Sequence, residues 1–214
     1  FFYLVDLSVT FSIWFFYLVA VLQEGITNRF GYDVTQPDAF VWGMQSLSWQ
    51  GWGAFGAMVL WSLWMGRRHL RLVVRQAFTR QRPLDDSQEM LSYRTAVLGL
   101  LAGVAYVVGW LWVAGLDLYL ALLFTLGVIA IYTGITRIVV QTGMYYLTTP
   151  VGAQALVTAV SGTAIGPGNL VTLGLQYSWH GDIQSVFMPS AAHASRLHGM
   201  SRRGWMMAAV LALA

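Results

Sequence analysis

Four stretches of this sequence are long, apolar and nearly free of charge, which restricts the chain to folds that a lipid bilayer can hold. They cover residues 1–22, 45–65, 95–114 and 118–136. A helix needs roughly 20 apolar residues to cross the ~30 Å hydrocarbon core, so each stretch predicts one transmembrane helix. Charged residues make up only 10% of the chain, against about 25% in soluble domains. The sequence predicts an all-α polytopic transmembrane helix bundle, a single domain over residues 1–214, and excludes a soluble globular protein.

The arginines predict how the spans are oriented. Seven of them lie in the connection 66–94, whereas the connection 23–48 holds one. Basic connections stay on the cytoplasmic side of a membrane, so 66–94 is predicted to be cytoplasmic in a prokaryotic inner membrane and 23–48 to be outside. Arg67, Arg71 and Arg75 recur every fourth residue. This spacing is typical of an amphipathic helix that touches lipid headgroups, and we expect no nucleic-acid partner.

One apolar segment, residues 150–178, breaks the pattern of full spans. Three glycines and Pro167 fall within seven residues near its centre, between two apolar flanks of about half a span each. Glycine and proline at this density end a helix. The segment therefore predicts either a re-entrant helical hairpin or a broken crossing helix. A hairpin keeps the later arginines Arg196, Arg202 and Arg203 on the cytoplasmic side, so the charge distribution favours it.

The break predicts a binding site. Non-helical backbone at membrane depth is tolerated only where protein or a wet cavity covers it, and half-helix ends in transporters bind substrates and ions. The residues expected to bind a substrate here are Ser161, Thr163, Gly166, Gly168 and Asn169. The alternative is an ordinary surface loop between two interfacial helices, or a simple proline kink.

Two further polar positions lie in or beside predicted spans. Asp6 is an ionisable group near the start of the first span, and such groups in a membrane helix indicate a functional site, here an ion-coupling carboxylate. Arg137 and Gln141 share one face of the fourth span with Thr133 and Tyr145, and this face is expected to line the substrate path. The alternatives are that Asp6 lies at headgroup level and that Arg137 snorkels to the interface.

Other features set limits on the chemistry. The sequence opens on Phe1 and closes on an apolar run from 204 that is too short to cross a membrane, so we expect a fragment with a truncated last span. The chain has no cysteine. His180, Asp182, His193 and His198 match no compact zinc spacing, and no metal site or cofactor is predicted. No hydrolase, phosphate-loop or paired-carboxylate motif occurs, so the chain is not expected to be an enzyme.

Three stretches resemble one group of prokaryotic polytopic membrane proteins of unknown function that are loosely similar to oligopeptide transporters. They read LVDLSVTFSIWFFYL at 4–18, WMGRRHL at 64–70, and RIVVQTG at 137–143 with the later Pro150. The resemblance covers essentially the whole chain and implies a C-terminal portion of a protein with a dozen or more helices. Many members of the group have a glutamate after the arginine, where this chain has Gln141 followed by Thr142. The resemblance implies a class of protein and no site residue.

The leading hypothesis is a secondary active transporter of a small anionic or zwitterionic solute, such as a short peptide, that passes the break at 161–169. The runner-up is a non-transporting membrane scaffold or assembly subunit, in which the glycines serve packing. A membrane-embedded enzyme would require Asp6 or the histidines to converge. The expected partners are the lipid bilayer and a small-molecule substrate, and homo-oligomerisation stays open.

Overall fold

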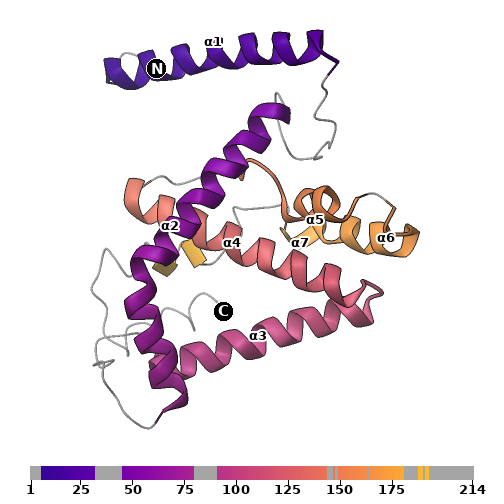
Figure 1. Ribbon diagram of the computed structural model, residues 1–214. Coiled ribbons are helices and arrows are strands. Elements are labelled where there is room, and N and C mark those ends of the chain that lie inside the picture. The colour runs from indigo at the N-terminus through magenta and orange to yellow at the C-terminus, as the bar shows by residue number, and fades with distance from the viewer. Residues whose placement is uncertain are drawn as a thin grey trace.

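A computed structural model describes residues 6–31, 45–79, 91–143, 147, 149–162, 164–180, 188–189 and 191–192. All of its regular elements are helices: α1 (Leu7–Arg29), α2 (Gln45–Phe78), α3 (Tyr93–Val113), α4 (Leu118–Thr142), α5 (Ala153–Ser161), α6 (Pro167–Leu175) and α7 (Tyr177–His180) (Figure 1). No strand occurs in this part of the chain, which confirms the all-α prediction. The span expected from 204 lies outside the described residues.

Three of these helices are long and apolar enough to cross a membrane: α1, α3 and α4. They correspond to three of the four predicted spans. The helix over the remaining one, α2, does not meet the same standard, because Gln50 and several glycines and tryptophans dilute its apolar residues before the arginines begin at Arg67. The structure therefore supports a membrane protein, with three candidate membrane-spanning helices among the described residues.

The helices α1 and α2 continue past the ends predicted for their apolar stretches. The expected loop from residue 23 is wrong as far as Arg29, because α1 includes those residues. Likewise α2 runs without interruption to Phe78, so the arginine-bearing stretch continues the same helix. Glutamine, glutamate, arginine and leucine are all good helix formers. An apolar stretch thus shows which residues can lie in hydrocarbon. Capping and helix propensity decide where the helix itself ends.

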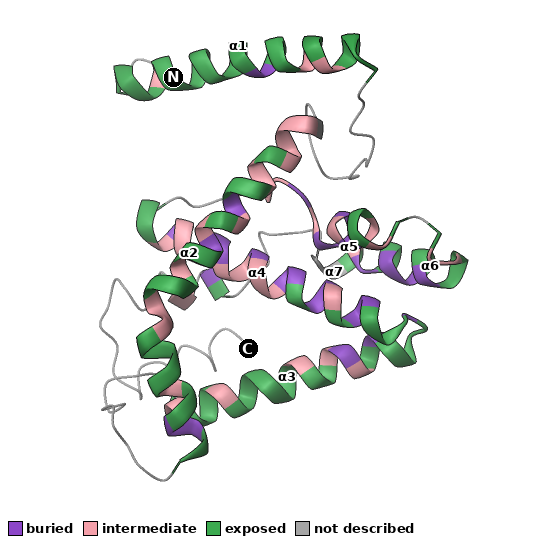
Figure 2. Cartoon of the chain, viewed as in Figure 1, coloured by how far each residue is buried: buried purple, intermediate pink, exposed green. Residues whose placement is uncertain are grey.

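The core is built around α4. Half of the residues in the most apolar window of α4 are buried, against 11% in α3 and 6% in α1. Figure 2 shows the buried residues concentrated along α4, while α1 is exposed along nearly all of its length. In Figure 1, α3 and α4 form a helical hairpin that α2 crosses, and α1 lies apart from them. The exposed apolar side chains of α1 and α3 are those that lipid would cover.

A Schellman motif closes α3 and sets the corner into α4. Gly115 has φ +99°, which glycine adopts without strain. The N–H of Leu116 donates to the carbonyl of Leu111 at 3.0 Å, and the N–H of Gly115 donates to that of Trp112 at 3.0 Å. Leu111 and Leu116 are both buried, as the hydrophobic contact of this motif requires. A tight turn over residues 115–117 therefore joins α3 to α4.

The crossing of α2 over α4 depends on a missing side chain. Phe55, which stacks on Trp52, lies directly over Gly134, and a Cβ at Gly134 would overlap its ring. In α3, by contrast, a Cβ at Gly103 would meet nothing within 4 Å. Both glycines lie inside helices, but only Gly134 has a neighbouring side chain in the space that a Cβ would occupy.

We therefore expect Gly134→Ala to lower the free energy of unfolding by about 1–3 kcal/mol, the usual cost of overpacking a core. Gly103→Ala is the matched control and should leave stability unchanged or raised, because alanine is the better helix former. Thermal unfolding in lipid nanodiscs, followed by tryptophan fluorescence, measures both. Equal stability of the two variants would contradict the packing of Phe55 on α4.

Candidate functional site

The segment 150–178 forms two short helices around a break, as predicted. The helices α5 and α6 have nine residues each, or roughly 14 Å of length. Gly162 ends the first with φ +76°, and Gly166 precedes the second with φ +89°. Pro167 occupies the first position of α6, where its missing N–H costs nothing. Each half-helix is too short to cross a bilayer alone.

The first half-helix packs against the middle of α4. Gly127 permits the approach, because a Cβ there would lie 3.2 Å from Leu156 Cδ2 and 3.4 Å from Ala153 Cβ. Val157, one turn after Ala153, is completely buried in the same core. The N-terminal residues of α5 are therefore enclosed by protein.

The second half-helix is attached to the corner between α3 and α4 by a side chain. Asn169 Oδ1 accepts from the Asp117 backbone N–H at 2.9 Å, and its Nδ2 donates to Asp117 Oδ2 at 2.8 Å. The same Nδ2 donates to the Ile165 carbonyl at 2.6 Å. Thr172 Oγ1 adds a longer bond to the Ala114 carbonyl at 3.3 Å. Asp117 is the N-cap of α4 but makes no side-chain cap bond, since its carboxylate is turned to Asn169.

The structure brings some predicted site residues together and separates others. Ser161, Gly166, Gly168 and Asn169 share the α5–α6 segment; Thr163 lies outside the described residues. Arg137 and Gln141 lie near the other end of α4. Arg137 is 20 residues beyond Asp117, which is about 30 Å along a helix axis. The polar face of α4 and the contact made by Asn169 therefore lie at opposite ends of one helix.

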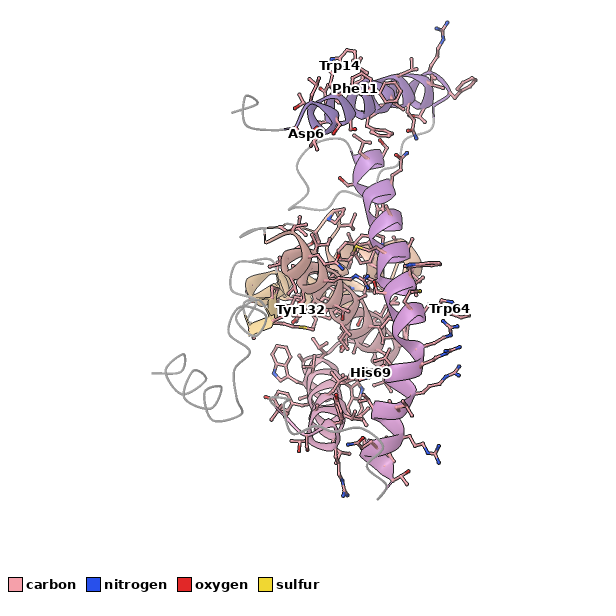
Figure 3. The ribbon with its side chains drawn as sticks, turned by 90° about the vertical axis from the view of Figure 1, so that its left-hand side faces the viewer. Asp6, Phe11, Trp14, Trp64, His69 and Tyr132 are labelled. Atoms are coloured by element: carbon pink, nitrogen blue, oxygen red, sulfur yellow. The ribbon has the colours of Figure 1, made fainter. Side chains whose placement is uncertain are left out.

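Asp6 is a helix cap in this structure. Its Oδ1 accepts from Ser8 N at 2.8 Å and from Ser8 Oγ at 2.5 Å, at the N-terminus of α1. The side-chain bond from Ser8, followed by the backbone bond, lowers the pKa of Asp6 from its ordinary value, against a smaller effect of desolvation. Asp6, labelled in Figure 3, and its partner Ser8 are both exposed. These bonds thus favour the charged form of Asp6.

A groove of about 330 Å³ lies between α3 and α4. Its lining is apolar and includes Gly99, Gly103, Phe124 and Tyr132; Tyr132 is labelled in Figure 3. None of the predicted site residues lines this groove, and its apolar lining suits a hydrocarbon chain.

Gln154 is the polar residue of this region that the sequence reasoning missed. It lies in the first turn of α5 and is only 3% exposed. Neither its Oε1 nor its Nε2 has a hydrogen-bond partner in the described chain. Buried polar atoms are nearly always paired, and an exception calls for an explanation. The sequence marks Gln154 only by its position two residues after Gly152, a glycine at which a helix can begin.

Comparison with known proteins gives a family. The model of a family described as "Family of unknown function (DUF6785)" matches residues 1–214. The chain belongs to this family. No curated protein and no solved structure matches the chain. Membership of the DUF6785 family thus accounts for the whole sequence and assigns no activity to any residue in it.

In this DUF6785 chain, Asn169→Ala should lower the free energy of unfolding by about 1–3 kcal/mol, because the N–H and the carboxylate of Asp117 would lose their partner. Thr172→Val removes the longer bond to Ala114 and should cost about 0.5 kcal/mol. Chemical unfolding in nanodiscs measures both. A larger loss for the threonine variant would show that Asn169 does not hold the corner.

Gln154→Leu should have the opposite sign and raise the free energy of unfolding by about 1–3 kcal/mol, since it removes a buried carboxamide with no partner and keeps a similar volume. Gln23→Leu, at an exposed position of α1, should change stability by less than about 0.5 kcal/mol. A loss of stability in Gln154→Leu alone would mean that its carboxamide is paired in the folded protein.

Proposed function

We propose that this chain is part of a membrane transport protein, a secondary active transporter of a small anionic or zwitterionic solute such as a short peptide. One observation carries the proposal: an apolar segment is broken, with non-helical backbone at Gly162 and at residues 164–166, and its first half-helix packs on the most buried candidate span. Discontinuous helices of this kind form the substrate sites of many secondary transporters. A structural helix in lipid gains nothing from such a break, because every freed backbone group must be satisfied again.

The proposed topology has four spans and a re-entrant segment. Residues 45–65 of α2 would form the remaining span, and its later arginines would lie at the cytoplasmic face, where Arg67 stacks on Trp64 at 4.5 Å and donates to its carbonyl at 2.7 Å. The helix α3 then runs outward and α4 returns. In this arrangement the corner at Asp117 faces outside, and α5 and α6 lie beside the outer half of α4.

A scaffold or assembly subunit is the second candidate, and the bonding of Asn169 favours it. Both polar atoms of that carboxamide are used within the fold, on Asp117 and Ile165. A residue so engaged contributes to packing unless the corner opens during transport. The two candidates therefore differ in whether water reaches the break from both sides of the membrane.

Single-cysteine labelling tests this, since the chain has no cysteine of its own. Ser161→Cys is nearly isosteric, and a Cβ at Gly168 meets nothing within 4 Å, so both substitutions should fold. A transporter predicts that an aqueous maleimide labels these positions from the cytoplasmic side and from the outside, in separate experiments on oriented vesicles. Protection at both positions, or labelling from one side only, would contradict transport through the break.

Two further positions control the experiment. Leu100→Cys places the thiol on the exposed apolar surface of α3, where lipid should protect it from the reagent. Thr79→Cys, at the exposed end of α2, should be labelled from the cytoplasmic side only. Labelling of Thr79→Cys from outside would reverse the proposed orientation.

A further inference from the structure

The start of α5 is a buried helix N-terminus whose N-cap residue makes no side-chain cap bond. The N-cap position is Gly152, which has no side chain to bond the first turn. The N–H of Leu156 donates to the Gly152 carbonyl at 3.2 Å, as the regular ladder requires. The N–H groups of the three preceding residues have no intrahelical acceptor. These residues, Ala153, Gln154 and Ala155, are all buried, so bulk water is not there to replace one.

Gln154 supplies an independent sign of a ligand at the same place. Side chains on a helix lean back toward its N-terminus, and this direction takes the side chain of Gln154 toward the first turn. Its Oε1 and Nε2 are both buried and without a partner in the described chain. The turn therefore combines main-chain N–H groups that have no intrahelical acceptor with a side-chain donor and a side-chain acceptor that have no partner in the described chain.

The position along α4 places this turn at depth. Ala153 and Leu156 lie against Gly127, which is nine residues into a helix of 25 residues. Nine residues correspond to about 14 Å, roughly half of the ~30 Å hydrocarbon core. If α4 crosses the bilayer, the uncapped turn lies near its midplane, the depth at which transporters hold their substrates.

We propose that the first turn of α5, with Gln154, binds a carboxylate or a similar oxyanion of the solute. The donors and the positive end of the helix dipole select an anionic oxygen. Nε2 of Gln154 would add one donor, and its Oε1 would accept from a neighbouring N–H of the same solute. The neighbours Ala153, Val157 and Gly127 are apolar, and none could neutralise a cation. This inference deepens the proposed function and moves its substrate-recognition site from the break to the start of α5.

The charge preference of the turn can be measured with two small thiol reagents of opposite charge. Ala155→Cys places a thiol in the first turn with Gln154 intact, and Ser161→Cys places one at the opposite end of the same helix. The probes are methanethiosulfonates that carry either a sulfonate or a trimethylammonium group. We expect the sulfonate reagent to be favoured at residue 155 by about fivefold over its preference at residue 161, because the helix dipole reverses between the two ends.

Adding Gln154→Leu to Ala155→Cys should remove part of this preference while the thiol stays reactive. A Gln154→Cys variant repeats the measurement if Ala155→Cys does not fold, as judged by its elution profile and helix content. Protection of both first-turn thiols from both reagents would overturn the site, and so would an equal or greater rate with the trimethylammonium reagent. If residue 161 is labelled from both sides while the first turn is protected, this inference fails and the transport proposal survives. Protection of residues 161 and 168 with an anion-selective first turn would give the reverse result.

Discussion

Backbone hydrogen bonding in a solvent without hydrogen-bond partners is the constraint on which this structure depends. Lipid cannot satisfy a free N–H or carbonyl group, so each departure from helix needs a partner supplied by the protein. The corner after α3 meets the requirement through the bonds of Gly115 and Leu116 to the last turn. The start of α6 meets this requirement through the side chain of Asn169, which accepts from the N–H of Asp117 and donates to the carbonyl of Ile165. Irregular backbone is tolerated here because specific side chains complete it.

The same constraint explains why α4 is central. In the proposed topology, a segment broken into two half-helices cannot face lipid along its whole length, so it must lie against a regular helix. Gly127 and Gly134 give α4 two flat surfaces, one for α5 and one for Phe55 of α2. The burial of α4 follows, and α1 and α3 are left to present apolar side chains outward, as membrane helices do. Small residues on α4 thus allow the close helix contacts that membrane packing relies on.

The apolar stretches predicted the regular elements well and their ends less well. The hairpin of α3 and α4, the turn at Gly115, and the end of α5 before Gly162 and start of α6 after Gly166 all follow from local chemistry that can be recognised in the sequence. The extension of α1 to Arg29 does not, because hydropathy reports the preferred solvent of a residue and not its backbone conformation. The pairing of Asn169 with Asp117 joins residues 52 apart, and no local pattern carries such a contact. The distance between Arg137 and the broken segment could not be predicted for the same reason. Helical spacing shows which residues of α4 lie on one face, but it does not show which end of α4 a later segment contacts.

The two carboxamides of the broken segment differ in a way that stability alone does not explain. Asn169 is paired at both polar atoms, and its bonds hold α6 to the corner. Gln154, on the other half-helix, is more deeply buried, and neither of its polar atoms has a partner in the part of the chain that the structure describes. A buried donor or acceptor without a partner costs on the order of 1–3 kcal/mol, and an alanine or leucine in its place would avoid that cost. Functional sites are where proteins hold such unfavourable groups, because the missing partner is the ligand. The half-helix whose carboxamide is bonded therefore supports the fold, whereas the half-helix whose carboxamide has no partner is the one that we propose binds the solute.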